Sequence, residues 1–379
     1  MIHPKALLDL LYEQEIEFFT GVPDSQLREF CDYLTQTLGI SNQHIVAPNE
    51  GNAVALAAGY HLATGKIGMV YMQNSGLGNA VNPMTSLVDP KVYAIPLVYM
   101  IGWRGMPGIH DEPQHVKQGE ITIDLLNLLG IHSILLSKES TIEEVATSFQ
   151  QTLLPALKEG KSVAFVVKKG AFESVTKYHH KVSSTLSRER AIELILQNTE
   201  EQDAIVSTTG KISREVYEQR EFHQQGHNKD FLTVGAMGHS SMIALQIAEQ
   251  KPQRRIWSLD GDGAMLMHTG ALALIGSRQP SNFIHVLLNN YVHESVGSIP
   301  TVAESINFLE IAKACGYQAV YQVQDEATLI QTIQHIKTEL GPILIQVNVS
   351  NGSREDLGRP KTSPIQNKTD FMQFLKGSR

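Results

Sequence analysis

Two polar residues in the second half of the chain have types and spacing suited to binding a divalent cation. One strand-like run leads into Asp260-Gly-Asp-Gly-Ala264, and the next ends in Asn289-Asn290. Parallel strands bring their carboxyl ends to one rim of a sheet, so we expect Asp262 and Asn290 to meet there. A carboxylate, an amide oxygen and a backbone carbonyl, here that of Val292, suit Mg²⁺, which prefers oxygen ligands and cofactor phosphates.

The glycines of the same turn indicate that the protein binds a phosphate group beside the cation. Gly261 and Gly263 allow a sharp turn, and the N–H groups around them, including that of Ala264, can then face a diphosphate at the start of the next helix. A lone Gly-Asp-Gly is usually only a turn. The full order of strand, Gly-Asp-Gly, helix, strand and Asn-Asn is far more specific. The pattern differs from two other phosphate-binding motifs, because neither a Walker loop nor a nicotinamide fingerprint follows a strand in this sequence.

The elements that position these residues alternate between short apolar runs and helical patterns. Several runs are apolar throughout, as in strands covered on both faces, so we predict an α/β fold with doubly wound parallel sheets. The expected strands are 18–22, 66–72, 92–101, 133–136, 162–167, 204–207, 255–259, 282–288, 319–323 and 343–349.

The polar composition of residues 176–187 predicts a linker between two domains, residues 1–175 and 188–379. The two halves resemble each other. The same number of residues separates Glu50 from Asn74 as separates Gly238 from Asp262, and each interval contains a helix, a strand and a turn. Duplication of one unit and coincidental spacing both remain open.

Composition limits the function classes. Of 379 residues, 42% are hydrophobic and 18% charged, which is typical of a globular protein. The net charge of −8 argues against nucleic acid as a partner, and means that an anionic substrate needs a local cluster of cations. The apolar runs are too short to span a bilayer, and the first helix is amphipathic rather than a signal peptide. We therefore expect a cytoplasmic location and no membrane partner.

The pattern around Asp262 and Asn290 resembles the signature of thiamine-diphosphate enzymes. The resemblance implies a pyrimidine-binding domain followed by a diphosphate-binding domain, with no room for a middle domain. It implies that Glu50, at the start of a helix, hydrogen-bonds the aminopyrimidine ring of thiamine diphosphate and assists the loss of a proton from the thiazolium. A glutamate at a helix N-terminus can also be a simple dipole partner.

Further cofactor contacts are implied by the same resemblance. Met237 would support the bent cofactor, and the carbonyl of Gly235 would accept its amino group. Thr209 and Gly210 follow a strand and resemble a second diphosphate-contacting loop.

Four stretches narrow the resemblance to the phosphonopyruvate decarboxylases, with the sulfopyruvate decarboxylases nearby. They are 21–25 (GVPDS), 101–105 (IGWRG), 108–115 (GIHDEPQH) and 349–360 (VSNGSREDLGRP). The implied reaction is the thiamine-diphosphate- and Mg²⁺-dependent decarboxylation of 3-phosphonopyruvate to phosphonoacetaldehyde and CO₂, in phosphonate biosynthesis. A sulfopyruvate decarboxylase, an acetolactate-type carboligase and a non-catalytic diphosphate-binding regulator are alternatives.

The phosphonate group must be held while the carboxylate is lost. Arg104 follows a strand, and its guanidinium suits phosphonate oxygens, with Ser25 as a further donor. Arg354 and Arg359 are other candidate cations.

Proton transfer needs a group that titrates near neutrality, which His110 and His115 provide. Asp24 resembles an acidic residue near the substrate of related decarboxylases. Each of the three could instead be an ordinary loop or turn residue. The resemblance also implies that Glu50 and Asp262 serve one cofactor from different chains, so we expect a homodimer or larger homo-oligomer with the cofactor at the subunit interface.

Overall fold

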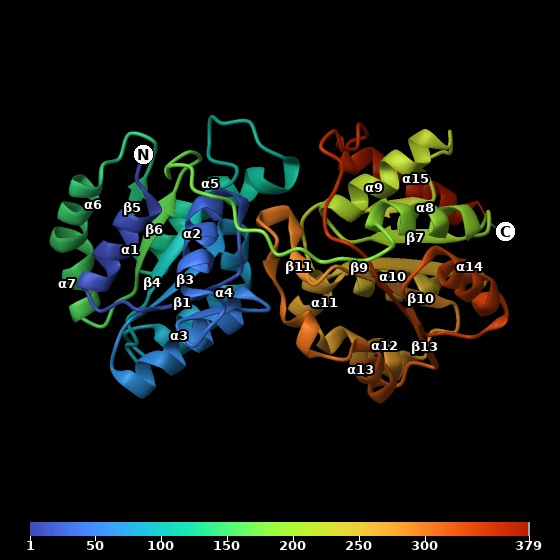
Figure 1. Cartoon of the computed structure of the whole chain (residues 1–379), viewed down its shortest axis with the longest axis horizontal. Coiled ribbons are helices and arrows are strands. Elements are labelled where there is room, and N and C mark those ends of the chain that lie inside the picture. The colour runs from blue at the N-terminus through green and yellow to red at the C-terminus, as the bar shows by residue number, and fades with distance from the viewer. Residues whose placement is uncertain (378–379) are drawn as a thin grey trace. The chain divides into compact units, whose positions relative to one another are not determined.

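The computed structural model describes residues 1–377 and divides the chain into two compact units. Unit 1 contains residues 1–179 and the short segment 296–300, and unit 2 contains residues 180–295 and those from 301 onward (Figure 1). The division between residues 179 and 180 falls in a stretch, 173–184, that has neither helix nor strand. Among the described residues, no helix has the length and apolar character needed to cross a membrane.

Unit 1 is built on a six-stranded sheet in the order β2-β1-β3-β4-β6-β5, with every pair parallel. Its strands are β1 (Phe18–Gly21), β2 (His44–Val46), β3 (Gly68–Gln73), β4 (Val98–Gly102), β5 (His132–Leu136) and β6 (Val163–Val167). Its helices are α1 (Pro4–Glu13), α2 (Arg28–Leu38), α3 (Glu50–Thr64), α4 (Leu77–Pro83), α5 (Pro113–Leu128), α6 (Ile142–Ser148) and α7 (Leu154–Lys158).

Unit 2 is built on a second parallel six-stranded sheet, in the order β13-β14-β10-β9-β7-β8. Its strands are β7 (Ala204–Ser207), β8 (Asp230–Leu232), β9 (Ile256–Gly261), β10 (Phe283–Asn289), β13 (Ala319–Val323) and β14 (Ile343–Asn348). Its helices are α8 (Arg188–Asn198), α9 (Lys211–Phe222), α10 (Ser240–Gln250), α11 (Asp262–Met267), α12 (Gly270–Arg278), α13 (Phe308–Cys315), α14 (Glu326–His335) and α15 (Pro364–Lys376).

Both sheets are covered on two faces, because alternate residues of a strand enter different cores. In unit 1, Met69 and Tyr71 of β3 pack in one buried cluster, and Val70 and Met72 pack in the other. Strand β10 of unit 2 divides its side chains in the same way. The fold class is therefore the predicted one, a pair of doubly wound parallel-sheet units.

The two units share one topology. If the strands of each unit are numbered in chain order, both sheets read 2-1-3-4-6-5. Two copies of one ancestral unit would give this result. In each unit the strand order along the sheet reverses between the first and third strands, which are β1 and β3 in unit 1 and β7 and β9 in unit 2. Ligands of open α/β sheets bind at such a switch point, beyond the carboxyl ends of the strands.

The ten expected strands are all present, with two kinds of difference. The run 92–101 is a strand only from Val98, because Ala94 has a positive φ of 53° and Pro96 lacks an N–H for a ladder. Two strands of the six-stranded sheets were not predicted, β2 and β8, which have three residues each and lie at sheet edges; the two-residue strands β11 (Val292–His293) and β12 (Ile299–Pro300) were not predicted either.

Candidate active site

The structure brings Asp262 and Asn290 together in unit 2. Strands β9 and β10 are paired with Gly261 opposite Leu288, so their carboxyl ends lie side by side. The Asp262 carboxylate accepts hydrogen bonds from the Thr301 hydroxyl, at 2.6 Å, and from the backbone N–H of Asn290. The two proposed metal ligands thus share one rim.

Asp262 is a buried carboxylate that lacks a cationic partner in the described part of the chain. Its residue is 2% exposed, and burial raises its pKa to about 6 although several hydrogen bonds act to lower it. A buried carboxylate is normally paired or bound to a metal. Among the described residues, no three His, Cys, Asp or Glu side chains are grouped so that they could hold a metal ion.

The sharp turn expected at Gly261 and Gly263 does not need the freedom of glycine, because Gly261 is extended, with φ −109° and ψ 159°, and Gly263 is helical. Gly261, the N-cap of α11, makes no side-chain cap hydrogen bond, and the Asp262 carboxylate itself accepts from the backbone N–H groups of Asp262 and Gly263. A Cβ on Gly263 would lie 3.2 Å from the ring of His293 and 3.4 Å from Cε of Met237. Gly263 therefore lies directly beside the residue predicted to support the cofactor.

The loop of Met237 has an unusual backbone. Gly235, Ala236 and Gly238 have φ values of 72°, 48° and 87°, and left-handed conformations at non-glycine residues concentrate at functional sites. The Thr209 hydroxyl accepts a hydrogen bond from the Gly235 N–H at 2.9 Å, which ties the two predicted cofactor loops together. Gly210 has a φ of 93° and caps α9.

Sequence reasoning missed Thr208. This residue is 3% exposed, and its hydroxyl finds no hydrogen-bond partner among the described residues. A buried orphan hydroxyl beside the predicted loop is suited to a ligand oxygen. Its position directly after β7 was the available signal.

Glu50 occupies the first position of α3 in unit 1, where the helix dipole favours its charge. The residue is 5% exposed, and its Oε2 accepts a hydrogen bond from Asn79 Nδ2 at 2.8 Å. A Cβ on Gly76 would lie 2.5 Å from Cγ and Oε1 of Glu50. Asn79 and Gly76, neither of which the sequence indicated, therefore fix the position of this carboxylate.

Asp24 and Ser25 lie just beyond β1, beside the carboxyl ends of β3 and β4. Asp24 accepts hydrogen bonds from Gln73 Nε2, at 2.5 Å, and from the Gln26 N–H, at 3.0 Å. Asp24 is 1% exposed, and burial raises its pKa despite these bonds and the nearby charge of Arg104. The acid is thus placed where it could hold a proton at higher pH than an exposed aspartate.

Arg104 does not offer a free positive charge. Its Nε and Nη2 atoms form a bidentate pair with Asp111 at 2.8 and 2.5 Å, and its Nη1 donates to the Ser25 hydroxyl at 3.1 Å. Asp111 was missed, because an aspartate in a loop gives no sign of its partner. Because Asp111 occupies Nε and Nη2, only Nη1 and the Ser25 hydroxyl are left to bind an anion.

The two candidate histidines have different environments. His115, in the first turn of α5, is buried, and burial together with the charge of Arg104 lowers its pKa to about 4. Its Nδ1 has no hydrogen-bond partner among the described residues. His110 is exposed on the loop before α5, so only His115 joins the group around Arg104.

Val292, Arg354 and Arg359 are the remaining expected residues. Val292 belongs with Asn290, because its N–H donates to Asn290 Oδ1 at 3.2 Å. The guanidinium of Arg354 contacts Glu189 and Glu218, so it is occupied by ion pairs. Arg359 lies in the segment 350–360, which has no helix or strand.

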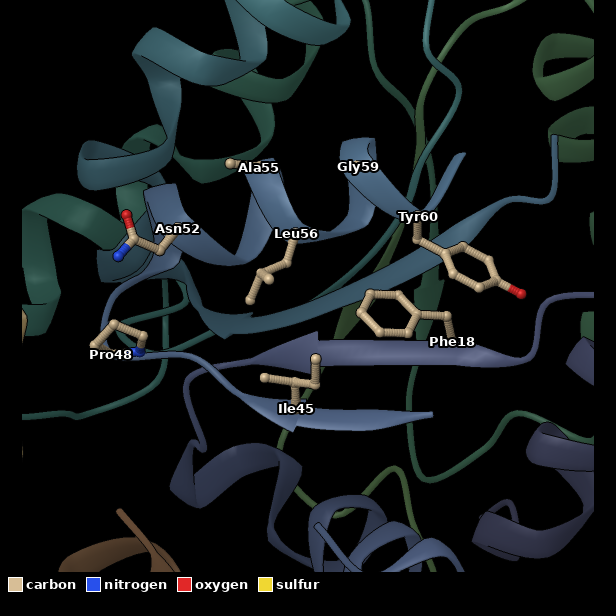
Figure 2. A pocket seen from close by; sticks show the side chains of 8 residues that line it. All are labelled: Phe18, Ile45, Pro48, Asn52, Ala55, Leu56, Gly59 and Tyr60. Atoms are coloured by element: carbon tan, nitrogen blue, oxygen red, sulfur yellow. The ribbon is translucent and has the colours of Figure 1, made fainter. Parts of the chain in front are cut away.

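A hollow of about 730 Å³ lies elsewhere on unit 1, over α3, β1 and β2 (Figure 2). Its lining is mostly apolar, with Phe18, Ile45, Leu56 and Tyr60 facing it. None of the predicted catalytic or cofactor residues lines it. We therefore place the chemistry at the strand ends and not in this hollow.

The two halves of the chain match two domains of one known enzyme family. Residues 3–128 match the N-terminal TPP-binding domain of thiamine pyrophosphate enzymes, and residues 208–347 match the C-terminal TPP-binding domain. The segments that carry the groups described above fall within these two matches.

Full-length relatives narrow the assignment. The chain is 35% identical to a phosphonopyruvate decarboxylase of Streptomyces viridochromogenes, over 91% of this chain and 89% of the relative. It is 33% identical to one of Streptomyces hygroscopicus, over 99% and 94%. A sulfopyruvate decarboxylase of Methanosarcina acetivorans is 27% identical over 81% of this chain and 82% of the relative. The chain therefore belongs to the phosphonopyruvate decarboxylase family of thiamine-diphosphate-dependent enzymes, and it is a carboxy-lyase.

Proposed function

We propose that the enzyme converts 3-phosphonopyruvate to phosphonoacetaldehyde and CO₂, with Mg²⁺ as the metal that binds thiamine diphosphate. The observation that carries the substrate is the identity to two phosphonopyruvate decarboxylases, 35% and 33% over at least nine-tenths of this chain. The observation that favours Mg²⁺ is the buried Asp262 carboxylate beside Asn290. A role in phosphonate biosynthesis follows if the substrate is correct.

The residues of unit 2 would hold the cofactor. Asp262, Asn290 and the Val292 carbonyl would bind Mg²⁺, and the N-terminal turn of α11, Gly261 to Ala264, would lie beside the diphosphate. Thr209 and Gly210 would contact the diphosphate from the other side. Met237 would support the ring system, and the Gly235 carbonyl would accept the amino group.

When bound, thiamine diphosphate supplies the electron sink that accepts the electron pair left by departing CO₂. Glu50 would hold a proton on its carboxyl group at the aminopyrimidine ring. Asn79 donates to one oxygen of this carboxyl group and so keeps it in one orientation.

The residues of unit 1 would bind the substrate and return a proton. Ser25 and the Nη1 edge of Arg104 would donate to the phosphonate, which remains on the product. The reaction consumes one proton for each CO₂ released. Asp24 is the proposed donor, since its pKa is raised. His115 does not titrate near neutrality as expected, because its pKa is lowered to about 4, so its unpartnered ring nitrogen would serve as a hydrogen-bonding group of the neutral ring.

The deciding experiment is incubation of pure protein with thiamine diphosphate, Mg²⁺ and phosphonopyruvate. We expect one aldehyde per CO₂, and no aldehyde with Asp262→Ala, which should also lose metal-dependent cofactor binding. Release of a condensed acid would instead indicate a carboligase. Unchanged cofactor affinity in Asp262→Ala would refute its role as a ligand.

Sulfopyruvate is the second candidate substrate, because sulfopyruvate decarboxylases also match the chain. Sulfonate and phosphonate differ mainly in charge, so kcat/KM for both acids should be compared at one pH. We expect phosphonopyruvate to be the better substrate. A higher kcat/KM for sulfopyruvate would reverse the assignment.

The active form is proposed to be a homodimer or larger homo-oligomer in a cytoplasmic location. The support is the pattern of the thiamine-diphosphate enzymes, in which the glutamate and the metal ligands that serve one cofactor come from different chains. Gel filtration with activity measured across the peak tests this proposal. A fully active monomer would contradict it.

A further inference from the structure

Four charged side chains form a buried network beside Asn290 in unit 2. Arg188, the first residue of α8, binds Glu215 through Nε and Nη2 at 2.7 and 2.6 Å, and its Nη1 binds Glu294. Lys211 Nζ binds the other oxygen of Glu294 at 2.8 Å. The side chains of Arg188, Glu215 and Glu294 are 4%, 1% and 6% exposed. The metal chemistry proposed above does not use any of these four residues.

The network ends on the amide of Asn290. Asn290 Nδ2 donates to Glu294 Oε2 at 2.8 Å, and the Val292 N–H donates to Asn290 Oδ1 at 3.2 Å. An amide has one donor end and one acceptor end, and these two contacts assign both. The amide oxygen uses one lone pair for Val292 and keeps a second for a cation.

Both carboxylate oxygens of Glu294 already accept hydrogen bonds from cations. Arg188 Nη1 donates to Oε2, and Lys211 Nζ donates to Oε1 at 2.8 Å. An ionised carboxylate cannot donate a hydrogen bond, so it can accept only the NH₂ end of Asn290. If the amide were reversed, two oxygens would face each other, and an NH₂ group would face the metal.

We propose that Glu294 is a positioning residue that fixes the Asn290 amide with its oxygen toward the metal, and that Arg188 and Lys211 hold Glu294 in place for this purpose. The inference rests on the proposed function, because it requires Asn290 to be a metal ligand. Residues that orient metal ligands typically contribute about 10–100-fold to metal affinity.

The test is Glu294→Gln, with Mg²⁺ affinity measured by titration calorimetry at saturating thiamine diphosphate, without substrate. Arg188 and Lys211 both require an acceptor, so they would compete for the single oxygen of the glutamine. Its NH₂ group would then face Asn290 and favour the reversed amide. We expect Mg²⁺ to bind about 10–100-fold more weakly. Unchanged Mg²⁺ affinity would overturn the proposal.

Glu215→Gln is the matched control. Glu215 is as buried as Glu294 and shares Arg188 with it, and the described structure shows no contact between its side chain and Asn290. Both variants remove one charge from the same network, so both should melt at a lower temperature. Only Glu294→Gln should lose Mg²⁺ affinity, and an equal loss in both would show a general effect of the network instead.

Two milder variants keep the proposal testable if either glutamine variant fails to fold. Glu294→Asp and Glu215→Asp both retain the charge and shorten the side chain by one methylene. Only the first lengthens the bond to Asn290, so only the first should weaken Mg²⁺ binding. Equal affinities of the two aspartate variants would overturn the proposal.

Failure of this inference can be told from failure of the proposed function. Asn290→Ala should lose most Mg²⁺-dependent cofactor binding. If it does not, the metal site itself is wrong. If it does while Glu294→Gln keeps normal affinity, the metal site stands and only the positioning role of Glu294 is refuted.

Discussion

Gly76 provides the sharpest test of the role of Glu50. It precedes α4 with φ −70° and ψ −16°, a conformation that alanine adopts without strain. A Cβ at this position would lie 2.5 Å from Cγ and Oε1 of Glu50 and 2.6 Å from its Cδ. Ordinary contacts between carbon atoms are about 3.5–4.0 Å, so the carboxylate must move by about 1 Å.

The displacement sets the size of the expected effect. A catalytic group misplaced by about 1 Å costs about 10²-fold in rate, or about 2.7 kcal/mol of transition-state stabilisation. We expect kcat of Gly76→Ala to fall by this factor. The Mg²⁺-dependent affinity for thiamine diphosphate should change little, because the metal and diphosphate contacts lie in unit 2. Steady-state kinetics and titration calorimetry measure the two quantities separately.

Gly78→Ala is the control, because it makes the same chemical change two residues later. Gly78 lies within α4, and a Cβ there would meet nothing within 4 Å. Replacing a helical glycine with alanine should stabilise the protein by up to about 1 kcal/mol and leave kcat unchanged. An unchanged kcat in Gly76→Ala, or an equal loss in Gly78→Ala, would refute the argument that Gly76 acts by leaving space for Glu50.

Two further predictions concern acid–base groups. Glu50→Gln should fold and bind thiamine diphosphate with Mg²⁺ while kcat falls steeply, because the amide cannot exchange the proton; near-normal turnover in a decarboxylation assay would remove Glu50 from the mechanism. Burial lowers the pKa of His44 from 6.5 to about 4, and its ring contacts the Gly39 carbonyl and the Tyr71 hydroxyl. Because the unfolded chain binds this proton more readily, the stability is complete above pH 6.5 and is lost as pH falls toward 4, by about 3 kcal/mol. Urea unfolding at pH 7 and pH 4 measures the loss, and His44→Gln should flatten it; an equal slope in the variant would show that another group is responsible.

The fold was predictable where a strand is a continuous run of apolar residues. Strands such as β6 and β10 are hydrophobic throughout, and their sequence alone predicts a strand covered on both faces. The missed strands β2 and β8 contain His44 and Asp230, polar residues that are buried because Tyr71 and Arg220 hydrogen-bond to them. Such partners lie far away in the sequence, so no local pattern indicates these strands.

The sequence also indicated some residues of the candidate site, but not the residues that orient them. Asp262, directly after the predicted strand β9, stands out by type and spacing, whereas Glu50 was indicated by the family resemblance. The residues that orient them do not stand out, because an Asn79 or a Glu294 has meaning only through its contact. The sequence likewise gives Arg104 a free charge, since the pairing with Asp111 appears only once the loop has folded.

The shared topology of the two units gives a reason for the proposed metal site to lie in unit 2. Asn74 directly follows β3 as Asp262 directly follows β9, and these strands hold the third place in chain order in their units. The Asn74 amide is consumed by its own unit, since Nδ2 donates to the Arg104 carbonyl and the Thr122 hydroxyl, and Oδ1 accepts from the Arg104 N–H. A neutral amide satisfied in this way has no need of a cation. Asp262 at the corresponding position has a charge that hydrogen bonds alone do not neutralise, and a cation bound there would compensate it. The same topology therefore presents a hydrogen-bonded amide in unit 1 and a buried carboxylate in unit 2 at corresponding positions.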